Sequence, residues 1–205
     1  MTEPRRRGRP PVSSGPTTRE IILQAARHVF SEQGYEGTTV TAVARRAGVT
    51  RPAVHHYFRT KESLYRALFA ATRQAVVAAG AASAGERETL SGRLSVFLWS
   101  ASRVDSHDRS FARFMAASVL DAFRHPELGD GAQGQLADVR EFVDGTLRAA
   151  VEAGEIRADT DVPAVTEMLV AVLWGMGLYA GFVGTHEQLE SVVEQFCRLL
   201  EGTLW

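Results

Sequence analysis

The sequence predicts an all-α protein of about nine helices, in which a small N-terminal unit is joined to a larger C-terminal one. Apolar residues recur at helical spacing along most of the chain, and no segment alternates with the period of two that a β-strand shows. Helix start signals and glycine stops divide the chain at short intervals. The charge is also divided, since residues 1–62 hold eleven Arg and Lys against five Asp and Glu, although the net charge is −1.

The composition is that of an ordinary globular protein. With 45% hydrophobic and 23% charged residues, it excludes a wholly disordered, collagen-like or disulfide-scaffold chain. The single cysteine, Cys197, cannot form an internal bridge, so we expect a reducing, cytoplasmic setting. No apolar segment follows the basic first residues, so no secretory signal is expected. The basic N-terminal third favours a polyanionic partner.

Residues 1–16 are expected to form a disordered basic arm, because four Arg and four Pro leave too little apolar surface for folding. The first helix begins after Thr17, which forms a capping box with Glu20, and it stops at Gly34. Three further helices are expected, each capped by a threonine. The second helix follows Thr39 and ends at Gly48, and the third spans Arg51 to about Tyr57. The fourth runs from Lys61 to about Ala82.

Beyond residue 85 the periodicity predicts four or five longer helices, near 86–103, 109–124, 134–153, 162–183 and 187–203. The helix near 162–183 overlaps a stretch from Met168 to His186 that contains no Asp, Glu, Lys or Arg. This uncharged stretch is barely long enough to span a membrane. Its nearest charged neighbours are acidic, and no Lys/Arg cluster flanks it. We therefore expect a helix buried in a soluble assembly, with no membrane partner.

Residues 40–59, VTAVARRAGVTRPAVHHYFR, have the pattern of a helix-turn-helix. Gly48 lies where the turn needs a positive φ, and Ala44 is small where the helices cross. Apolar Val43, Val49 and Val54 are expected to face a shared core. Four basic side chains then lie outside, where phosphates and bases would be: Arg45, Arg46, Arg51 and His55.

Residues 17–77 resemble the DNA-binding domain of the TetR family of bacterial transcriptional regulators. The resemblance rests on Gly34-Tyr35, Thr38-Thr39-Val40, Ala44, Ala47 to Thr50, His56-Tyr57-Phe58, Lys61-Glu62 and Leu64. It implies a homodimeric repressor of double-stranded operator DNA, whose residues 78–205 bind a small effector and dimerise. DNA contact is implied at Thr41, Thr50, Arg51, Ala53, His55, His56 and Lys61, and Arg45 is added from its outward position. The family often has tyrosine where this chain has His55.

The arm carries Arg5, Arg6, Arg7 and Arg9, and its Arg-Gly-Arg-Pro core resembles an AT-hook, an extended segment that enters a narrow A·T minor groove. The alternative is a basic tail that attracts phosphates without specificity. Tyr57 and Phe58, in contrast, are expected in the core rather than at DNA.

The C-terminal half holds many aromatic residues, which favours an apolar, lipophilic or aromatic effector. The expected lining residues are Phe97, Trp99, Phe111, Phe114, Met115, Phe142, Trp174 and Tyr179. The last two helices of each protomer are expected to form a four-helix dimer interface. Its apolar faces would come from Leu169, Val172, Leu173, Met176, Leu189, Val192, Val193, Phe196 and Leu200.

Two other classes of function account for parts of the same sequence. An architectural DNA-binding protein without an effector would keep the arm and the helix-turn-helix. An enzyme using His55 and His56 is disfavoured, because these neighbours point about 100° apart on a helix and have no carboxylate nearby in sequence. Asp105, His107 and Asp108 fall in an expected loop with no further His or Cys at ligand spacing. Neither a metal nor another cofactor is expected.

Overall fold

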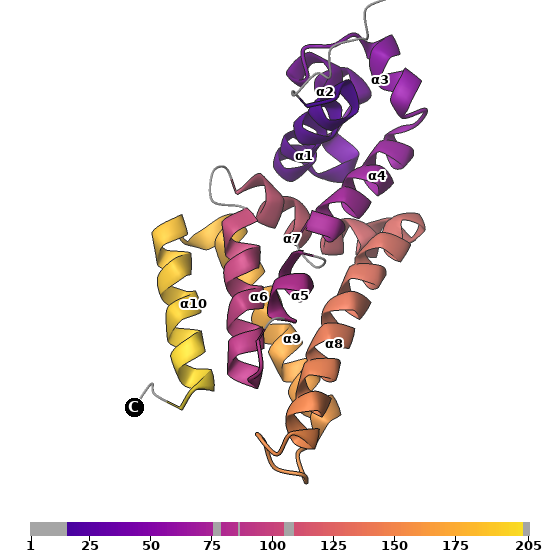
Figure 1. The fold of residues 1–205 in the computed structure, drawn as a ribbon. Coiled ribbons are helices and arrows are strands. Elements are labelled where there is room, and N and C mark those ends of the chain that lie inside the picture. The colour runs from indigo at the N-terminus through magenta and orange to yellow at the C-terminus, as the bar shows by residue number, and fades with distance from the viewer. Residues whose placement is uncertain (1–15, 76–78, 86, 105–108, 203–205) are drawn as a thin grey trace, which may run out of the picture.

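The structure, a computed structural model, describes residues 16–75, 79–85, 87–104 and 109–202. Ten α-helices, a 3-10 turn and a π-helical turn account for its regular structure in these ranges, where no strand occurs (Figure 1). The all-α prediction is therefore confirmed. Arg5, Arg6, Arg7 and Arg9 lie outside the described residues, as do Asp105, His107 and Asp108.

The N-terminal unit consists of α1 (Thr18–Gly37), α2 (Val40–Arg46), α3 (Arg51–Tyr57) and α4 (Lys61–Arg73). Each begins after the threonine that the sequence indicates, and each threonine hydroxyl accepts a bond from a backbone N–H in the first turn. Gly34 interrupts α1 with a φ of 66°, a left-handed conformation that glycine adopts at little cost.

The C-terminal unit consists of α5 (Ala79–Ala84), α6 (Leu90–Val104), α7 (Ser110–Arg124), α8 (Gly129–Glu152), α9 (Val162–Leu178) and α10 (His186–Leu200). The 3-10 turn Pro126–Leu128 precedes α8, and the π-helical turn Tyr179–Val183 continues α9. In Figure 1, α8 and α10 lie on opposite sides of this unit, and α7 lies next to α1 and α4. Helix α7 is thus the element between the two units.

Two predicted helix ranges are wrong. The range 61–82 is two helices, because α4 packs against α1 and α8 whereas α5 packs against α6. A Cβ at Gly80 would lie 2.8 Å from the Phe97 ring, so α5 sits too close to α6 for a larger residue. The range 134–153 begins earlier, at Gly129, because Gly129, Gly131 and Gly134 all lie inside α8. Tertiary packing here overrides the low helix propensity of glycine.

Three clusters of buried residues form the core. The first joins α1, α2, α3 and α4 to one face of α7. The second lies between α6, α8 and α9, and the third between α6 and α10. The first cluster extends across the two units, so the side chains of α7 help to support the helix-turn-helix.

Candidate nucleic-acid interface

The turn between α2 and α3 has the geometry that its sequence predicts. Gly48 has a φ of 67°, and its N–H donates to the Arg45 carbonyl at 3.3 Å. The next amide, Val49 N–H, donates to the Ala44 carbonyl at 3.0 Å. These bonds satisfy the last carbonyls of α2 while the chain reverses. The short turn holds α3 at a fixed position relative to α2.

Apolar residues anchor this motif. Val43 and Val54 are fully buried and Ala44 is 3% exposed, so both helices pack with one face on the core of the N-terminal unit. Phe58, which ends α3, is also buried, as expected. Tyr57 is not: it is 43% exposed, so its assignment to the core is wrong. It lies one turn after Ala53 on the outer side of α3, a position that the i, i+4 spacing could have indicated.

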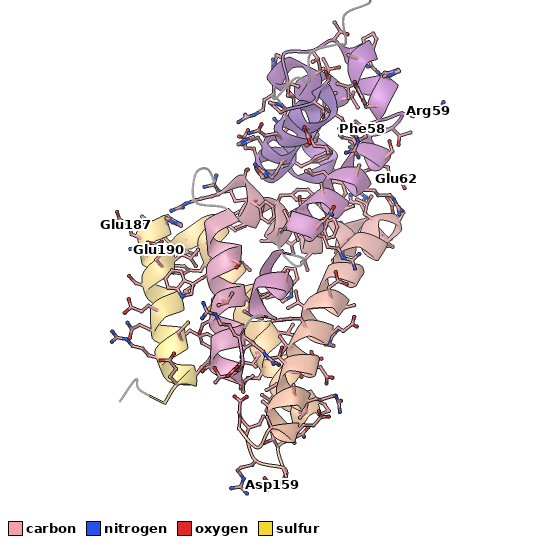
Figure 2. All side chains as sticks on the ribbon, in the orientation of Figure 1. Phe58, Arg59, Glu62, Asp159, Glu187 and Glu190 are labelled. Carbon is pink, nitrogen blue, oxygen red and sulfur yellow. The ribbon has the colours of Figure 1, made fainter. Side chains whose placement is uncertain are left out.

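Most of the predicted DNA-contacting side chains are on the surface. Thr41, Arg45, Thr50, Arg51 and His56 are exposed, whereas Ala53, His55 and Lys61 are half-buried. Figure 2 shows Phe58 and Arg59 where α3 ends and Glu62 at the start of α4. Arg59 is exposed and was not among the predicted contacts. The surface at α3 and the residues that follow it therefore exposes two arginines, Arg51 and Arg59, together with His56.

Several basic side chains have partners within the protein. The Arg51 Nε–H donates to His55 Nε2 at 3.3 Å, and His55 Nδ1 lies 3.2 Å from the Arg59 carbonyl oxygen. Arg46 forms an ion pair with Glu32 at 3.3 Å. Since both of these side chains are about half exposed, that pair contributes little to stability.

Lys61 is tied to the end of α1. Its ammonium donates to the Tyr35 carbonyl at 2.9 Å and the Glu36 carbonyl at 3.4 Å, and lies 4.3 Å from the centre of the Tyr35 ring. This arrangement fastens the start of α4 to the last turn of α1. The structure thus gives Lys61 an internal contact that the sequence pattern did not predict.

Asp121 connects α7 to the N-terminal unit. It is 7% exposed, and its carboxylate accepts bonds from the Tyr65 hydroxyl at 3.2 Å and the Tyr35 N–H at 3.4 Å. Burial, followed by the negative charge of Asp121, raises the pKa of Tyr65. The helix-turn-helix pattern did not predict this role for Asp121. A sign of it was available, because Asp121 is the one acidic residue on the α7 face that also carries Phe111, Phe114 and Ser118.

His125, just after α7, makes a second connection. Its Nε2 lies 2.9 Å from Glu36 at the end of α1, and its Nδ1 lies 3.3 Å from Glu127. Its ring also packs against Tyr35, with the ring centres 5.1 Å apart. Arg66 of α4 donates to the Glu127 carbonyl. The end of α7 thus touches both helices that support the helix-turn-helix.

The residues predicted to line an effector pocket are divided among the three core clusters. Phe111, Phe114 and Met115 pack in the first cluster, against the N-terminal unit. Phe97, Phe142 and Trp174 belong to the second, where the rings of Phe97 and Phe142 stack with centres 4.6 Å apart. Trp99 and Tyr179 pack on the third. The three α7 residues therefore pack apart from the other five, and the effector site itself stays a prediction.

Of the nine residues predicted for the dimer interface, three are buried in their own protomer and six are half-buried. Leu169, Leu189 and Val193 are buried in their own protomer. Leu173, Met176, Phe196 and Leu200 pack partly against the second and third clusters, and Val192 and Val172 are half-buried. A side chain buried within one chain has little surface left for another. The six half-buried residues keep part of their surface, so an interface on α9 and α10 stays a prediction.

A different face of α9 is exposed and apolar. Met168, Leu178 and Phe182 are each more than half exposed, as is Val183, and Leu199 of α10 is 44% exposed. Met168, Leu178 and Phe182 lie in one line with three small exposed residues, at alternating spacings of four and three. We call this line the α9 stripe: Ala164, Met168, Ala171, Gly175, Leu178 and Phe182. Such spacing is typical of a helix that packs lengthwise on another.

By length and composition alone, Val162–Val183 could cross a membrane, with a mean hydropathy of 1.5. The same segment contains the α9 stripe, and only 17% of its most apolar window is buried in the protomer. One such helix is weak evidence for a span, since an apolar helix covered by another chain has the same composition.

A surface groove of about 360 Å³ lies between α8 and α9. Four of its seven lining residues are charged and none is aromatic, and Arg140 pairs with Glu167 across it at 2.5 Å. The hydrogen bonds between them raise the pKa of Arg140 and lower that of Glu167. This groove is not the apolar cavity that the aromatic content predicted.

Two sequence profiles match the chain. Residues 22–68 match "Bacterial regulatory proteins, tetR family", and residues 85–196 match "Tetracyclin repressor-like, C-terminal domain". The HTH-type transcriptional regulator UidR of Escherichia coli K12 is 25% identical over 161 residues, 78% of this chain and 79% of its own. The HTH-type transcriptional repressor AcnR of Corynebacterium glutamicum is 45% identical over 51 residues, 25% of this chain and 27% of its own.

Solved structures share the fold. FadR of Bacillus subtilis in complex with stearoyl-CoA has a TM-score of 0.74 at 21% identity, covering 90% of this chain and 98% of that one. FadR of Bacillus halodurans has a TM-score of 0.78 at 20% identity, covering 94% and 98%. The second profile alone spans more than half of the chain, and the profiles describe regulators rather than enzymes. The chain therefore belongs to the TetR family, and it is a helix-turn-helix DNA-binding transcriptional regulator.

Proposed function

We propose that the protein is a cytoplasmic, homodimeric repressor that binds double-stranded operator DNA through α3 and releases it when a small apolar effector binds the C-terminal unit. The observation that carries this proposal is the outer side of α3, where Arg51 and His56 are exposed while the inner face is anchored by Val54 and Phe58. The repressor that is 45% identical over 51 residues supports the direction of regulation.

The proposed operator contacts combine reading and anchoring residues. Arg51 opens α3 and is suited to a base edge, because a guanidinium can bind guanine through two parallel bonds. Arg45, His56 and the arm arginines are suited to phosphates or the minor groove. The full proposed set is Arg5, Arg6, Arg7, Arg9, Thr41, Arg45, Thr50, Arg51, Ala53, His56 and Lys61, to which we add Tyr57 and Arg59 because they are exposed.

We propose that two protomers associate through the α9 stripe together with the exposed side of α10. Large apolar side chains that stay more than half exposed, such as Met168 and Leu178, are unfavourable on a soluble monomer. A symmetric pairing of α9 and α10 would cover them on both chains at once. It would also set the spacing of the two α3 helices, which a repressor needs to reach successive major grooves.

We propose that the effector binds in the second core cluster, between α6, α8 and α9, close to Phe97, Phe142 and Trp174. These aromatic side chains favour an apolar ligand. Two buried hydroxyls, those of Ser95 and Thr166, have no hydrogen-bond partner among the described residues and could accept the polar part of such a ligand. The similarly folded FadR that binds stearoyl-CoA supports an acyl-chain ligand as the first compound to test.

The test begins with DNA selected by the purified protein from a library of random sequences. Arg51→Ala should weaken binding to the selected site by about 1–3 kcal/mol, roughly 5- to 150-fold, and lose preference at one base position. Stearoyl-CoA is then titrated against the preformed complex, with Trp174 fluorescence as the binding signal. A ligand that binds tightly but leaves DNA affinity unchanged would favour an architectural role, because it does not discriminate between two states.

A further inference from the structure

His55 uses both of its ring nitrogens inside the protein. Nε2 is 3.3 Å from the Arg51 Nε, and Nδ1 is 3.2 Å from the Arg59 carbonyl oxygen. The ring is half-buried, whereas Arg51 and Arg59 are exposed. His55 therefore lies one helical turn after Arg51 on α3, and it is less exposed than that arginine.

These contacts fit one tautomer of the ring. A carbonyl oxygen only accepts hydrogen bonds, so Nδ1 must carry the proton that is donated to Arg59. The Arg51 Nε–H is a donor, so Nε2 must offer its lone pair. The neutral imidazole protonated at Nδ1 meets both requirements, and neither nitrogen is then left for a phosphate or a base.

The bond to His55 restrains Arg51 without consuming its recognition groups. Guanidinium has five N–H donors, of which this bond uses the one on Nε. The four N–H groups on the two terminal nitrogens remain available for a bidentate contact with guanine. A long side chain that is already oriented loses less conformational entropy on binding.

We propose that His55 is a positioning residue, which orients the Arg51 guanidinium for base recognition and does not itself contact DNA. The inference rests on the proposed role of Arg51 in operator binding. It assigns to His55 a function different from the direct contact implied by its place in the motif. It also accounts for histidine at this position, since the small ring can accept from Arg51 and donate to Arg59 at the same time.

The test is a double-mutant cycle on the selected operator, with His55→Leu, Arg51→Ala and the double variant. His55→Leu keeps an apolar side chain of similar reach but removes both hydrogen bonds. We expect it to weaken operator binding by about 2- to 10-fold, which is the usual range for releasing one long side chain. It should lose preference at the same base position as Arg51→Ala, and it should have almost no effect in the Arg51→Ala background.

Two further variants separate positioning from packing. His55→Gln, whose amide can donate and accept, should restore most of the base preference. His56→Leu, at the exposed neighbouring histidine, should show an effect that adds to that of Arg51→Ala. Thermal unfolding of each variant establishes that the helix-turn-helix is folded.

Three results would overturn the inference. These are an equal effect of His55→Leu with and without Arg51, a loss of preference at a different base, or unchanged preference. If Arg51→Ala itself leaves every base preference intact, the proposed operator contact fails, and the role of His55 fails with it. The single Arg51 variant therefore distinguishes the failure of the proposed function from the failure of this inference.

Discussion

The proposed dimer interface gives the sharpest prediction, through Leu178→Glu. Leu178 is 54% exposed in the protomer and lies between Gly175 and Phe182 on the α9 stripe. Burying a whole leucine contributes about 1.5–3 kcal/mol, so the exposed half should contribute about 1 kcal/mol per copy and about 2 kcal/mol per dimer. Losing this contribution alone corresponds to a dissociation constant roughly 30-fold higher. Two glutamates placed in the contact add a desolvation cost of several kcal/mol per ion.

Sedimentation velocity at micromolar concentration measures this effect. We expect a dimer for the unmodified protein and a folded monomer for Leu178→Glu, since the protomer leaves half of that side chain in water. Operator binding should fall as well, because the two linked α3 helices lose their effective concentration. Leu120→Glu on α7 is the matched control, since Leu120 is 58% exposed but lies off the α9 stripe.

The outcomes separate the exposed stripe of α9 from the buried face of α10. Val193→Asp, at a side chain 1% exposed, should unfold the protomer rather than split a folded dimer. If Leu178→Glu stays dimeric while Leu120→Glu dissociates, the interface lies on α7 and the α9 stripe has been wrongly assigned. If the unmodified protein is monomeric, the paired-groove arrangement fails entirely.

Three other predictions concern the turn, the junction and the arm. Gly48→Ala should destabilise the fold by about 1–2 kcal/mol in urea unfolding, because its φ of 67° strains any residue with a Cβ, even though that Cβ would meet nothing within 4 Å. The control is Gly145→Ala, in open space on α8, which should be neutral or stabilising. Because the pKa of Tyr65 is raised in the folded protein, its contribution to the free energy of unfolding is complete below about pH 10 and is lost as the pH rises further. Tyr65→Phe should therefore flatten the alkaline decline in unfolding free energy, and an unchanged decline would contradict this prediction. Deleting residues 1–15 should lower the salt slope of DNA binding by about four, and an unchanged slope would show that the arm makes no phosphate contacts.

The parts of the fold that could be predicted from sequence are those set by local chemistry. The threonine caps at Thr17, Thr39, Thr50 and Thr60 each need only the residues of one helical turn. The turn at Gly48 likewise depends on one residue that tolerates a positive φ. The helix-turn-helix and its exposed Arg51 follow from these signals together with the alternation of apolar and charged positions.

The parts that could not be predicted depend on which neighbour covers each helix face. Helix α9 carries apolar residues on several sides, so its pattern does not separate buried Leu169 from exposed Met168. The buried face of α7 has a clear pattern, but nothing in it shows that Phe114 packs against α1 and α4 rather than around an effector. Asp121 was missed for the same reason, since its partners lie 56 and 86 positions away in sequence.

The position of α7 also bears on the proposed boundary near residue 77. Phe114 is 1% exposed, and its ring packs against Phe30, Tyr65 and Phe69 of the N-terminal unit. Residues 17–77 alone would expose these rings and leave the Tyr65 hydroxyl without Asp121. The boundary therefore separates the residues proposed to bind DNA from those proposed to bind effector, but it does not separate two cores. Helix α7 belongs to the C-terminal unit by sequence, but its buried face is part of the core of the N-terminal unit. A shift of α7 therefore has to move α1 and α4 as well, or break that packing.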